Sequence, residues 1–197
     1  MHASYNAQRD LNFFIQEKQK LELVSNYNVK GLRHHYWHMT RNEDQTLKMH
    51  ESSGFEYDSS MAFNDGLGFR KNIAYAFFPW NKEAIRRLDT LQLPVFCMDG
   101  NLFYGDINCE DAVATIKTYI ELIKSYEGVG IIDWHVRSSY PKNAEYSEWG
   151  KAYVKIIEYL ASDSEIWTTN LYAIASWLIK QEKKVPQKHA GRGTSGL

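Results

Sequence analysis

The sequence is short of cysteine, of long apolar runs and of excess charge, and each shortage excludes a class of protein. Its two cysteines, Cys97 and Cys109, match no zinc-binding spacing and are too few for a disulfide framework. No apolar run reaches membrane-spanning length, and the first residues show no basic-then-apolar signal pattern. We therefore expect no membrane-spanning segment, and the cellular compartment stays unknown.

The charge balance argues against a nucleic-acid-binding protein. The 23 Lys and Arg nearly cancel the 24 Asp and Glu, and no basic stripe precedes the C-terminal tail. The 44% of hydrophobic residues suffices for one core. We expect a single α/β domain over residues 1–184, followed by a flexible tail over residues 185–197, where Pro, Gly, Ser and basic residues replace the apolar pattern.

Hydrophobic periodicity predicts strands that alternate with helices. A first helix, capped by Ser4 or Asn6, should run to about Ser25 with Leu11, Phe14 and Leu21 on one face. Further helices should begin at Asn42, at Asn108, after Pro141 and near Leu171. We expect strands at 29–33, 55–60, 93–98, 129–134 and 166–168, with a long loop at 61–80. This alternation predicts parallel pairing, and hence an α/β sheet or barrel.

Polar residues gather where four of these strands end: 33–36, Asp58, Asp99, and 133–135. In parallel α/β folds this edge carries the ligand site. His135, just after a strand, can act as a general acid or base if a carboxylate orients it, and Asp99 is the preferred partner, with Asp58 second. A structural histidine bonded to a loop carbonyl is the alternative. Arg33 can orient a carboxylate through its rigid fork of donors, or form a plain salt bridge.

The stretch 31–39 holds three histidines, His34, His35 and His38, beside Arg33. Alternate residues of a strand face the same way, so these three histidines cannot all bind one metal from a strand. We therefore interpret them as residues of the site's edge or of the structure.

These segments, in this order, resemble the polysaccharide deacetylases built on the NodB homology domain. Arg33-His34-His35-Tyr36 is similar to the family's Arg-x-Pro-Tyr motif, and Asp133-Trp134-His135 is similar to its Leu-x-His motif. The resemblance implies a distorted (β/α) barrel and a divalent metal that activates water to cleave an acetamido or related amide bond. It also implies that Arg33 positions the catalytic aspartate, that the Tyr36 backbone N–H helps hold the oxyanion, and that His135 protonates the departing amine.

Two family motifs differ in this chain. The Thr-Phe-Asp-Asp motif, which supplies the base and a metal ligand, has no equivalent, so the group that Arg33 should position is missing. The His-Ser/Thr-x-x-His motif reads 2–6, with His2 at the first ligand position and Asn6, a poor zinc ligand, at the second. We therefore expect an incomplete barrel of the deacetylase type, N-terminally truncated, that binds a divalent, zinc-like metal only if the missing ligands are supplied, and otherwise has no cofactor.

Two functions follow as hypotheses. The first is a deacetylase-like hydrolase acting on a carbohydrate C–N amide bond, with activity doubtful for this fragment. The second is a non-catalytic carbohydrate-binding or structural remnant of that fold. Expected substrate contacts are Trp37, Asp58, Arg70 and Trp134, and the second hypothesis adds stacking by Tyr36, Trp80 and Tyr140. Because a truncated barrel leaves open strand edges, we also expect a homo-oligomer or pairing with the missing N-terminal segment.

Overall fold

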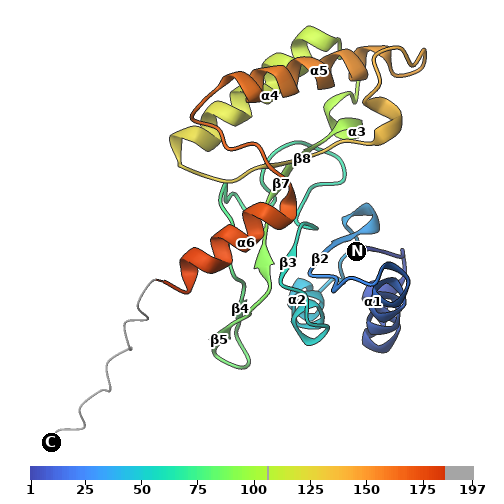
Figure 1. Cartoon of the computed structure of the whole chain (residues 1–197), viewed down its shortest axis with the longest axis vertical. Coiled ribbons are helices and arrows are strands. Elements are labelled where there is room, and N and C mark those ends of the chain that lie inside the picture. Colours follow the sequence, from blue (N-terminus) through green and yellow to red (C-terminus); the bar gives the residue numbers. More distant parts are fainter. Residues whose placement is uncertain (106, 185–197) are drawn as a thin grey trace, which may run out of the picture.

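The structure is a computed structural model that describes residues 1–105 and 107–184; the tail predicted at 185–197 lies outside the described residues. Its helices and strands follow one another along the chain in Figure 1. The α-helices are α1 (Leu11–Ser25), α2 (Glu43–Ser52), α3 (Asp99–Leu102), α4 (Cys109–Ser125), α5 (Ser147–Ser162) and α6 (Leu171–Glu182), and the 3-10 helices are η1 (Ala7–Arg9), η2 (His35–Trp37) and η3 (Val136–Ser138). The strands are β1 (His2–Ala3), β2 (Gly31–His34), β3 (Tyr57–Asp58), β4 (Trp80–Asn81), β5 (Arg86–Arg87), β6 (Leu91–Gln92), β7 (Val95–Met98) and β8 (Ile131–Asp133).

The strands form parallel sheets, as the alternation predicts. One sheet has the order β1-β2-β3-β6 with every pair parallel, and β7 pairs with β8 in parallel. The segment from β6 to β7 joins the two groups, since Leu93 N donates to Asp58 O (2.8 Å) and Ile131 N donates to Pro94 O (2.9 Å). The order therefore runs from β1 through β2, β3 and β6–β7 to β8.

The predicted barrel is not confirmed by this topology. Within residues 1–105 and 107–184, β1 pairs only with β2 and β8 pairs only with β7, so the pairing does not close. The prediction of a strand at 166–168 is wrong, because these residues are irregular and Trp167 is 55% exposed. The antiparallel hairpin of β4 and β5 was not predicted. Strand β8, expected to be buried on both faces, is only half-buried.

The helix caps explain where α1 and α4 begin. Asp10, rather than Ser4 or Asn6, caps α1, and its carboxylate accepts hydrogen bonds from Asn12 N (2.8 Å) and Phe13 N (3.1 Å). Asn108 caps α4 as predicted, accepting from Asp111 N at 3.0 Å. The apolar face of α1 is narrower than its pattern indicates, because Phe14 is fully buried whereas Leu11 and Leu21 are 40% and 39% exposed.

The largest part of the core lies between α4, α5 and the β7–β8 pair. Helices α4 and α5 lie side by side in Figure 1. Their facing sides bury small and branched residues, namely Ala112, Val113, Ile116, Ile120, Ala152 and Ile156. A separate cluster around Phe14 fills the space between α1 and strand β2. In the described residues, no helix is both long and apolar enough to cross a membrane.

Candidate active site at the carboxyl ends of the strands

An aspartate and a histidine meet where β7 and β8 end. Because Met98 and Asp133 are register partners in the parallel pair, the residues that follow each strand emerge next to each other. Asp99 is 1% exposed, and its Oδ1 lies 2.7 Å from His135 Nδ1. Asp99 also accepts hydrogen bonds from His135 N (3.0 Å), Gly100 N (2.8 Å) and the Ser138 hydroxyl. The carboxylate is thus held on all sides by donors.

This contact fixes the orientation of the imidazole. An ionised carboxylate can only accept, so the proton of neutral His135 lies on Nδ1 and its Nε2 is left with a lone pair. The side chain of His135 is 44% exposed, whereas that of Asp99 is 1% exposed. A buried carboxylate behind a half-exposed imidazole is the arrangement that a general acid or base needs. The catalytic role of His135 stays a prediction.

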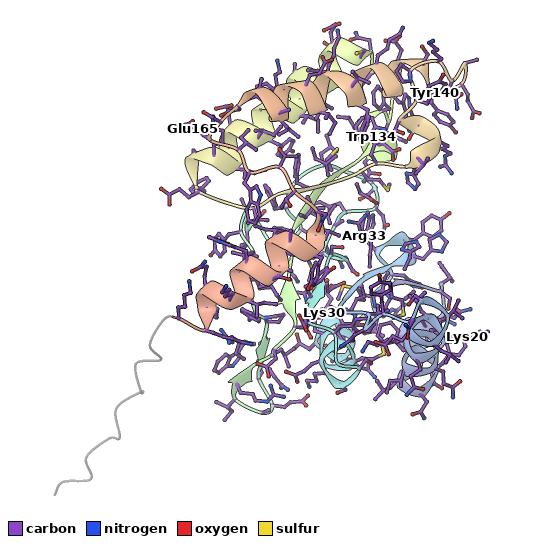
Figure 2. The ribbon with its side chains drawn as sticks, in the orientation of Figure 1. Lys20, Lys30, Arg33, Trp134, Tyr140 and Glu165 are labelled. Atoms are coloured by element: carbon purple, nitrogen blue, oxygen red, sulfur yellow. The ribbon has the colours of Figure 1, made fainter. Side chains whose placement is uncertain are left out.

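An ion pair joins β2 to β8 across the sheet. The Arg33 guanidinium contacts the Asp133 carboxylate, and Arg33 Nε also donates to Ser59 Oγ at 3.1 Å. Two strand positions, β3 and β6–β7, lie between β2 and β8. In a flat sheet, β2 and β8 would therefore be roughly 14 Å apart. The direct contact therefore means that the sheet curves and brings both side chains to its concave side. Figure 2 shows Arg33 between the segment that carries Trp134 and the N-terminal helices.

The ion pair is the plain salt bridge that the sequence left open as the alternative for Arg33. Its partner is Asp133. The two side chains are only 18% and 23% exposed, and the Arg33 guanidinium lies 5.2 Å from the centre of the Trp37 ring. Sequence reasoning missed this pair because the two residues are 100 positions apart and meet only through the curvature of the sheet.

The short helix η2 has a strained backbone. Tyr36 and Trp37 both have positive φ, 54° and 52°, a conformation that costs bulky residues roughly 1–2 kcal/mol each. The turn buries Trp37, which is 4% exposed against Ala62 and Val95, and leaves Tyr36 66% exposed. Trp37 therefore cannot be the stacking surface predicted for a substrate, because its ring is enclosed by the core.

The predicted metal ligands do not form a metal site with the residues present. His2 lies on β1 with its ring 5.1 Å from that of His35, and Asn6 precedes η1 without capping it through its side chain. In the part of the chain that the structure describes, no group of three or more His, Cys, Asp and Glu could hold a metal ion. Burial and the neighbouring His35 lower the pKa of His2. One histidine and one amide are too few for zinc.

Three other predicted substrate contacts are occupied within the protein. Asp58 is fully buried and accepts from Ser60, which excludes direct contact with a substrate. Arg70 donates to Glu43 at 2.6 Å, a carboxylate that Lys71 also contacts. The Trp134 ring packs against Phe103, with ring centroids 6.1 Å apart. Burial therefore excludes Asp58 as a substrate contact, whereas Arg70 and Trp134 have contacts within the protein but are only partly buried.

The remaining stacking candidates lie apart from each other. Trp80, 56% exposed, lies on β4, which is near the bottom of Figure 1, whereas β8 is near the middle. Tyr140 is 58% exposed and lies beyond Trp134 in Figure 2. Tyr5 was not predicted, yet its exposed ring meets that of Tyr36 edge-on, with centroids 6.2 Å apart. The positive φ of Tyr36 cannot be read from the sequence, because nothing in the residue type favours it.

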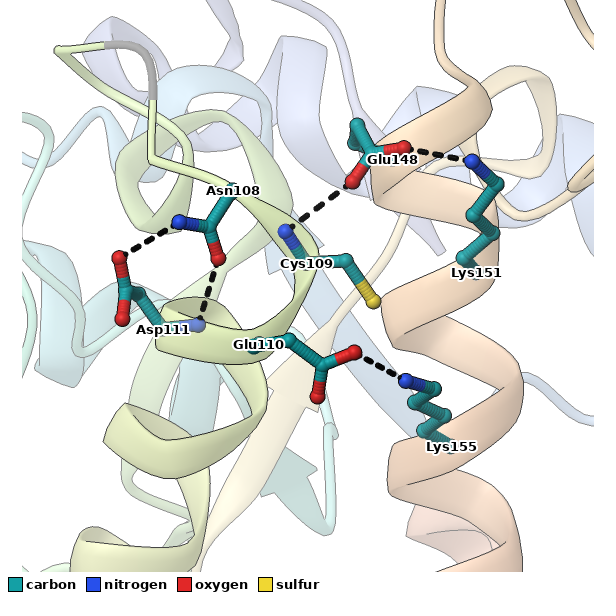
Figure 3. Close-up of a pocket in the computed structure, with 7 residues that line it drawn as sticks. All are labelled: Asn108, Cys109, Glu110, Asp111, Glu148, Lys151 and Lys155. Carbon is teal, nitrogen blue, oxygen red and sulfur yellow. Dashed lines mark hydrogen bonds and ion pairs between the residues drawn. The ribbon is translucent and has the colours of Figure 1, made fainter.

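Two surface depressions lie in different parts of the molecule. One, of about 270 Å³, is lined by residues around β1 and β2, including His2 and Arg33. The other, of about 350 Å³, lies between the start of α4 and α5 and is drawn in Figure 3. There Lys151 pairs with Glu148 at 2.6 Å and Lys155 pairs with Glu110, so both lysine charges are matched. The first depression shares Arg33 with the candidate site, whereas the second lies between two helices whose lysines are already paired.

The fold and the polar groups at the strand ends define a mixed α/β domain with parallel sheets, similar to a deacetylase fold. A solved structure of a Mycobacterium smegmatis protein, provisionally assigned as a polysaccharide deacetylase, matches it with a TM-score of 0.65 at 16% sequence identity. The match covers 92% of this chain and 61% of that chain, so the chain spans less than two thirds of that protein. No family model matches the sequence. No curated protein matches it. At this identity the likeness shows the fold alone.

Proposed function

We propose that the domain is a polysaccharide deacetylase-like hydrolase that cleaves an N-acetyl or related C–N amide bond on a carbohydrate. The observation that carries the proposal is the Asp99–His135 contact, in which a buried carboxylate orients a half-exposed imidazole. The likeness of the fold to a protein provisionally assigned as a polysaccharide deacetylase supports the choice of reaction.

In this reaction His135 transfers a proton from the attacking water to the leaving group. As water adds to the amide carbonyl carbon, neutral His135 takes its proton at Nε2, and Asp99 stabilises the resulting imidazolium from the Nδ1 side. The imidazolium then gives this proton to the amine nitrogen as the C–N bond breaks, which leaves a free amine and a carboxylic acid. Arg33 holds the Asp133 carboxylate in place, and the Tyr36 backbone N–H is proposed as a donor to the oxyanion. A divalent, zinc-like metal belongs to the proposal only if ligands beyond His2 and Asn6 are supplied.

A second candidate function, carbohydrate binding without hydrolysis, is favoured by the exposed aromatic rings. Tyr5 and Tyr36 are 50% and 66% exposed and lie together at the carboxyl ends of β1 and β2. Flat aromatic faces stack on the apolar faces of sugar rings. The strained backbone that holds Tyr36 outward is a feature that recurs at functional sites.

The two functions are separated by assaying amine release from an N-acetylated sugar oligomer, with and without added zinc. The hydrolase proposal predicts amine release that His135→Ala lowers by roughly 100-fold or more. Tyr126→Ala, which removes a 68% exposed ring at the end of α4, is the control and should keep the activity. Oligomer binding without amine release in the wild type would contradict hydrolysis and support the second function.

A further inference from the structure

A cluster of buried polar groups lies behind the candidate site, between strands β2 and β3 and helices α1 and α2. His34, His50 and Asp58 are 1%, 0% and 0% exposed. Phe14 of α1 stacks on both imidazoles, with ring centroids 5.4 and 5.9 Å away. Groups of this kind are costly to bury unless they bond to each other.

The cluster closes on itself as a ring of polar contacts. His34 Nε2 lies 2.8 Å from His50 Nε2, and His50 Nδ1 lies 3.7 Å from Asp58 Oδ2. Ser60 Oγ donates to Asp58 Oδ1 at 2.5 Å and accepts from His34 N at 2.8 Å. The ring therefore ties α2 to the ends of β2 and β3.

The two histidines cannot both be protonated in this geometry. Their Nε2 atoms share one hydrogen bond, in which one nitrogen donates and the other must keep its lone pair. Among the described residues, His34 Nδ1, His50 Nδ1 and Asp58 Oδ2 have no hydrogen-bond partner. A metal does not explain the cluster, because Asp58 lies on the Nδ1 side of His50, away from the paired Nε2 atoms.

We propose that the ring of His34, His50, Asp58 and Ser60 is an acid-sensitive joint that keeps Arg33 in place. Arg33 precedes His34, and Ser59, which accepts from Arg33 Nε, precedes Ser60. Protonation of both histidines removes the Nε2–Nε2 bond and places two positive charges in a closed space. The ends of β2 and β3 then separate from α2, and Arg33 loses its contact with Ser59.

The pKa values of the two histidines support a loss of stability at acid pH. Burial lowers the pKa of His34 to about 4 and that of His50 to about 3, from the ordinary value of 6.5. The unfolded chain therefore binds more protons than the folded chain below about pH 6.5, so stability falls as the pH drops toward the folded values. Burial raises the pKa of Asp58, which offsets part of this loss because the folded chain takes up that proton first.

The charged groups around the cluster have opposing effects on the pKa values of His34 and Asp58. His38 and His2 disfavour a charge on His34, whereas Asp58 favours it. Arg33 and a charged His34 favour ionised Asp58. Phe14, which faces the cluster from α1, brings no charge. Since these neighbours are retained in a variant that lacks one buried histidine, the difference between that variant and the wild type reports on the buried pair.

Urea unfolding of the full chain between pH 7 and pH 5 tests the joint. His50→Gln removes one side chain that takes up a proton in the unfolded chain. Below pH 6, the folded-to-unfolded ratio of this variant should therefore fall about tenfold less per pH unit than the ratio of the wild type. His34→Gln should act likewise. The matched control is His35→Gln, which removes an exposed histidine next to His34 and should change the slope less than either buried variant does. Equal slopes for His50→Gln, His34→Gln and the wild type would overturn the proposal.

Hydrogen exchange of the wild type keeps the test decisive if the buried variants fail to fold. Acidification from pH 7 to pH 5 should deprotect the amides of 32–34 and 59–61 before those of α4, after correction for the intrinsic exchange rate. Loss of protection at the same pH in α4 and in these two segments would overturn a local joint. This readout does not depend on hydrolase activity, so its failure is distinguishable from failure of the proposed function.

Discussion

The molecule holds two aspartate–histidine pairs that differ in their access to solvent. In the Asp99–His135 pair the atoms lie 2.7 Å apart and the histidine side chain is 44% exposed. In the Asp58–His50 pair they lie 3.7 Å apart and both side chains are fully buried. The same two residue types therefore serve a candidate proton-transfer site in one region and a buried structural contact in the other. Solvent access, rather than residue type, separates the two roles.

The position of each aspartate relative to its strand explains the difference. Asp99 is the first residue after β7, so its side chain meets the residues that leave β8 at the same edge. Asp58 lies within β3, and its side chain faces the layer of α1 and α2. A side chain that leaves the sheet at a strand end can reach a ligand, whereas one that faces the helices cannot.

The largest expected effect concerns the buried pair. Phe14→Ala should lower the free energy of unfolding by about 3–5 kcal/mol, because it leaves a cavity beside both buried imidazoles. Leu11→Ala, in the same helix but 40% exposed, is the control and should change stability by less than about 1 kcal/mol. Urea unfolding at pH 7 measures both. Equal losses would mean that α1 does not seal the buried pair.

The next effect concerns the half-exposed pair. Asp99→Ala should cost about 2–4 kcal/mol, because Gly100 N, His135 N and the Ser138 hydroxyl lose their shared acceptor. Asp99→Asn keeps one acceptor oxygen and should cost less. Thermal unfolding ranks the two variants. A loss under 0.5 kcal/mol for Asp99→Ala would show that the carboxylate does not hold the strand end together.

The smallest expected effect is the coupling between Arg33 and Asp133. A double-mutant cycle with Arg33→Met and Asp133→Leu should give about 1–2 kcal/mol, since both side chains are mostly buried. The same cycle on the half-exposed pair of Lys151 and Glu148 should give less than about 0.5 kcal/mol. Equal coupling energies at the two sites would contradict a structural role for the Arg33–Asp133 contact.

The sequence predicted the residues of the candidate site better than the contacts that support these residues. The alternation of strands and helices placed Asp99 and His135 at the same edge, because parallel neighbours end together. The strand predicted at 166–168 failed because apolar residues in a short run do not show whether a neighbouring strand is present to pair with. The cap of α1 was misplaced because Ser4, Asn6 and Asp10 are all acceptable caps by residue type.

The contacts that escaped prediction depend on curvature and on packing between distant segments. Arg33 meets Asp133 only because the sheet curves, and His34 meets His50 only because α2 packs against β2. The positive φ of Tyr36 and Trp37 accompanies the burial of Trp37 against Ala62 and Val95, which lie far along the chain. None of these leaves a periodic pattern along the chain.

The most direct measurement of the central claim, that carbohydrate meets the protein at the carboxyl ends of the strands, is a titration followed by NMR. An N-acetylated sugar oligomer is added to the full chain while the histidine imidazole and tyrosine ring signals are recorded. The predicted result is a change at His135 and Tyr36, with the signals of buried His34 and His50 unchanged. Binding of the oligomer that leaves the signals of both His135 and Tyr36 unchanged would contradict the account.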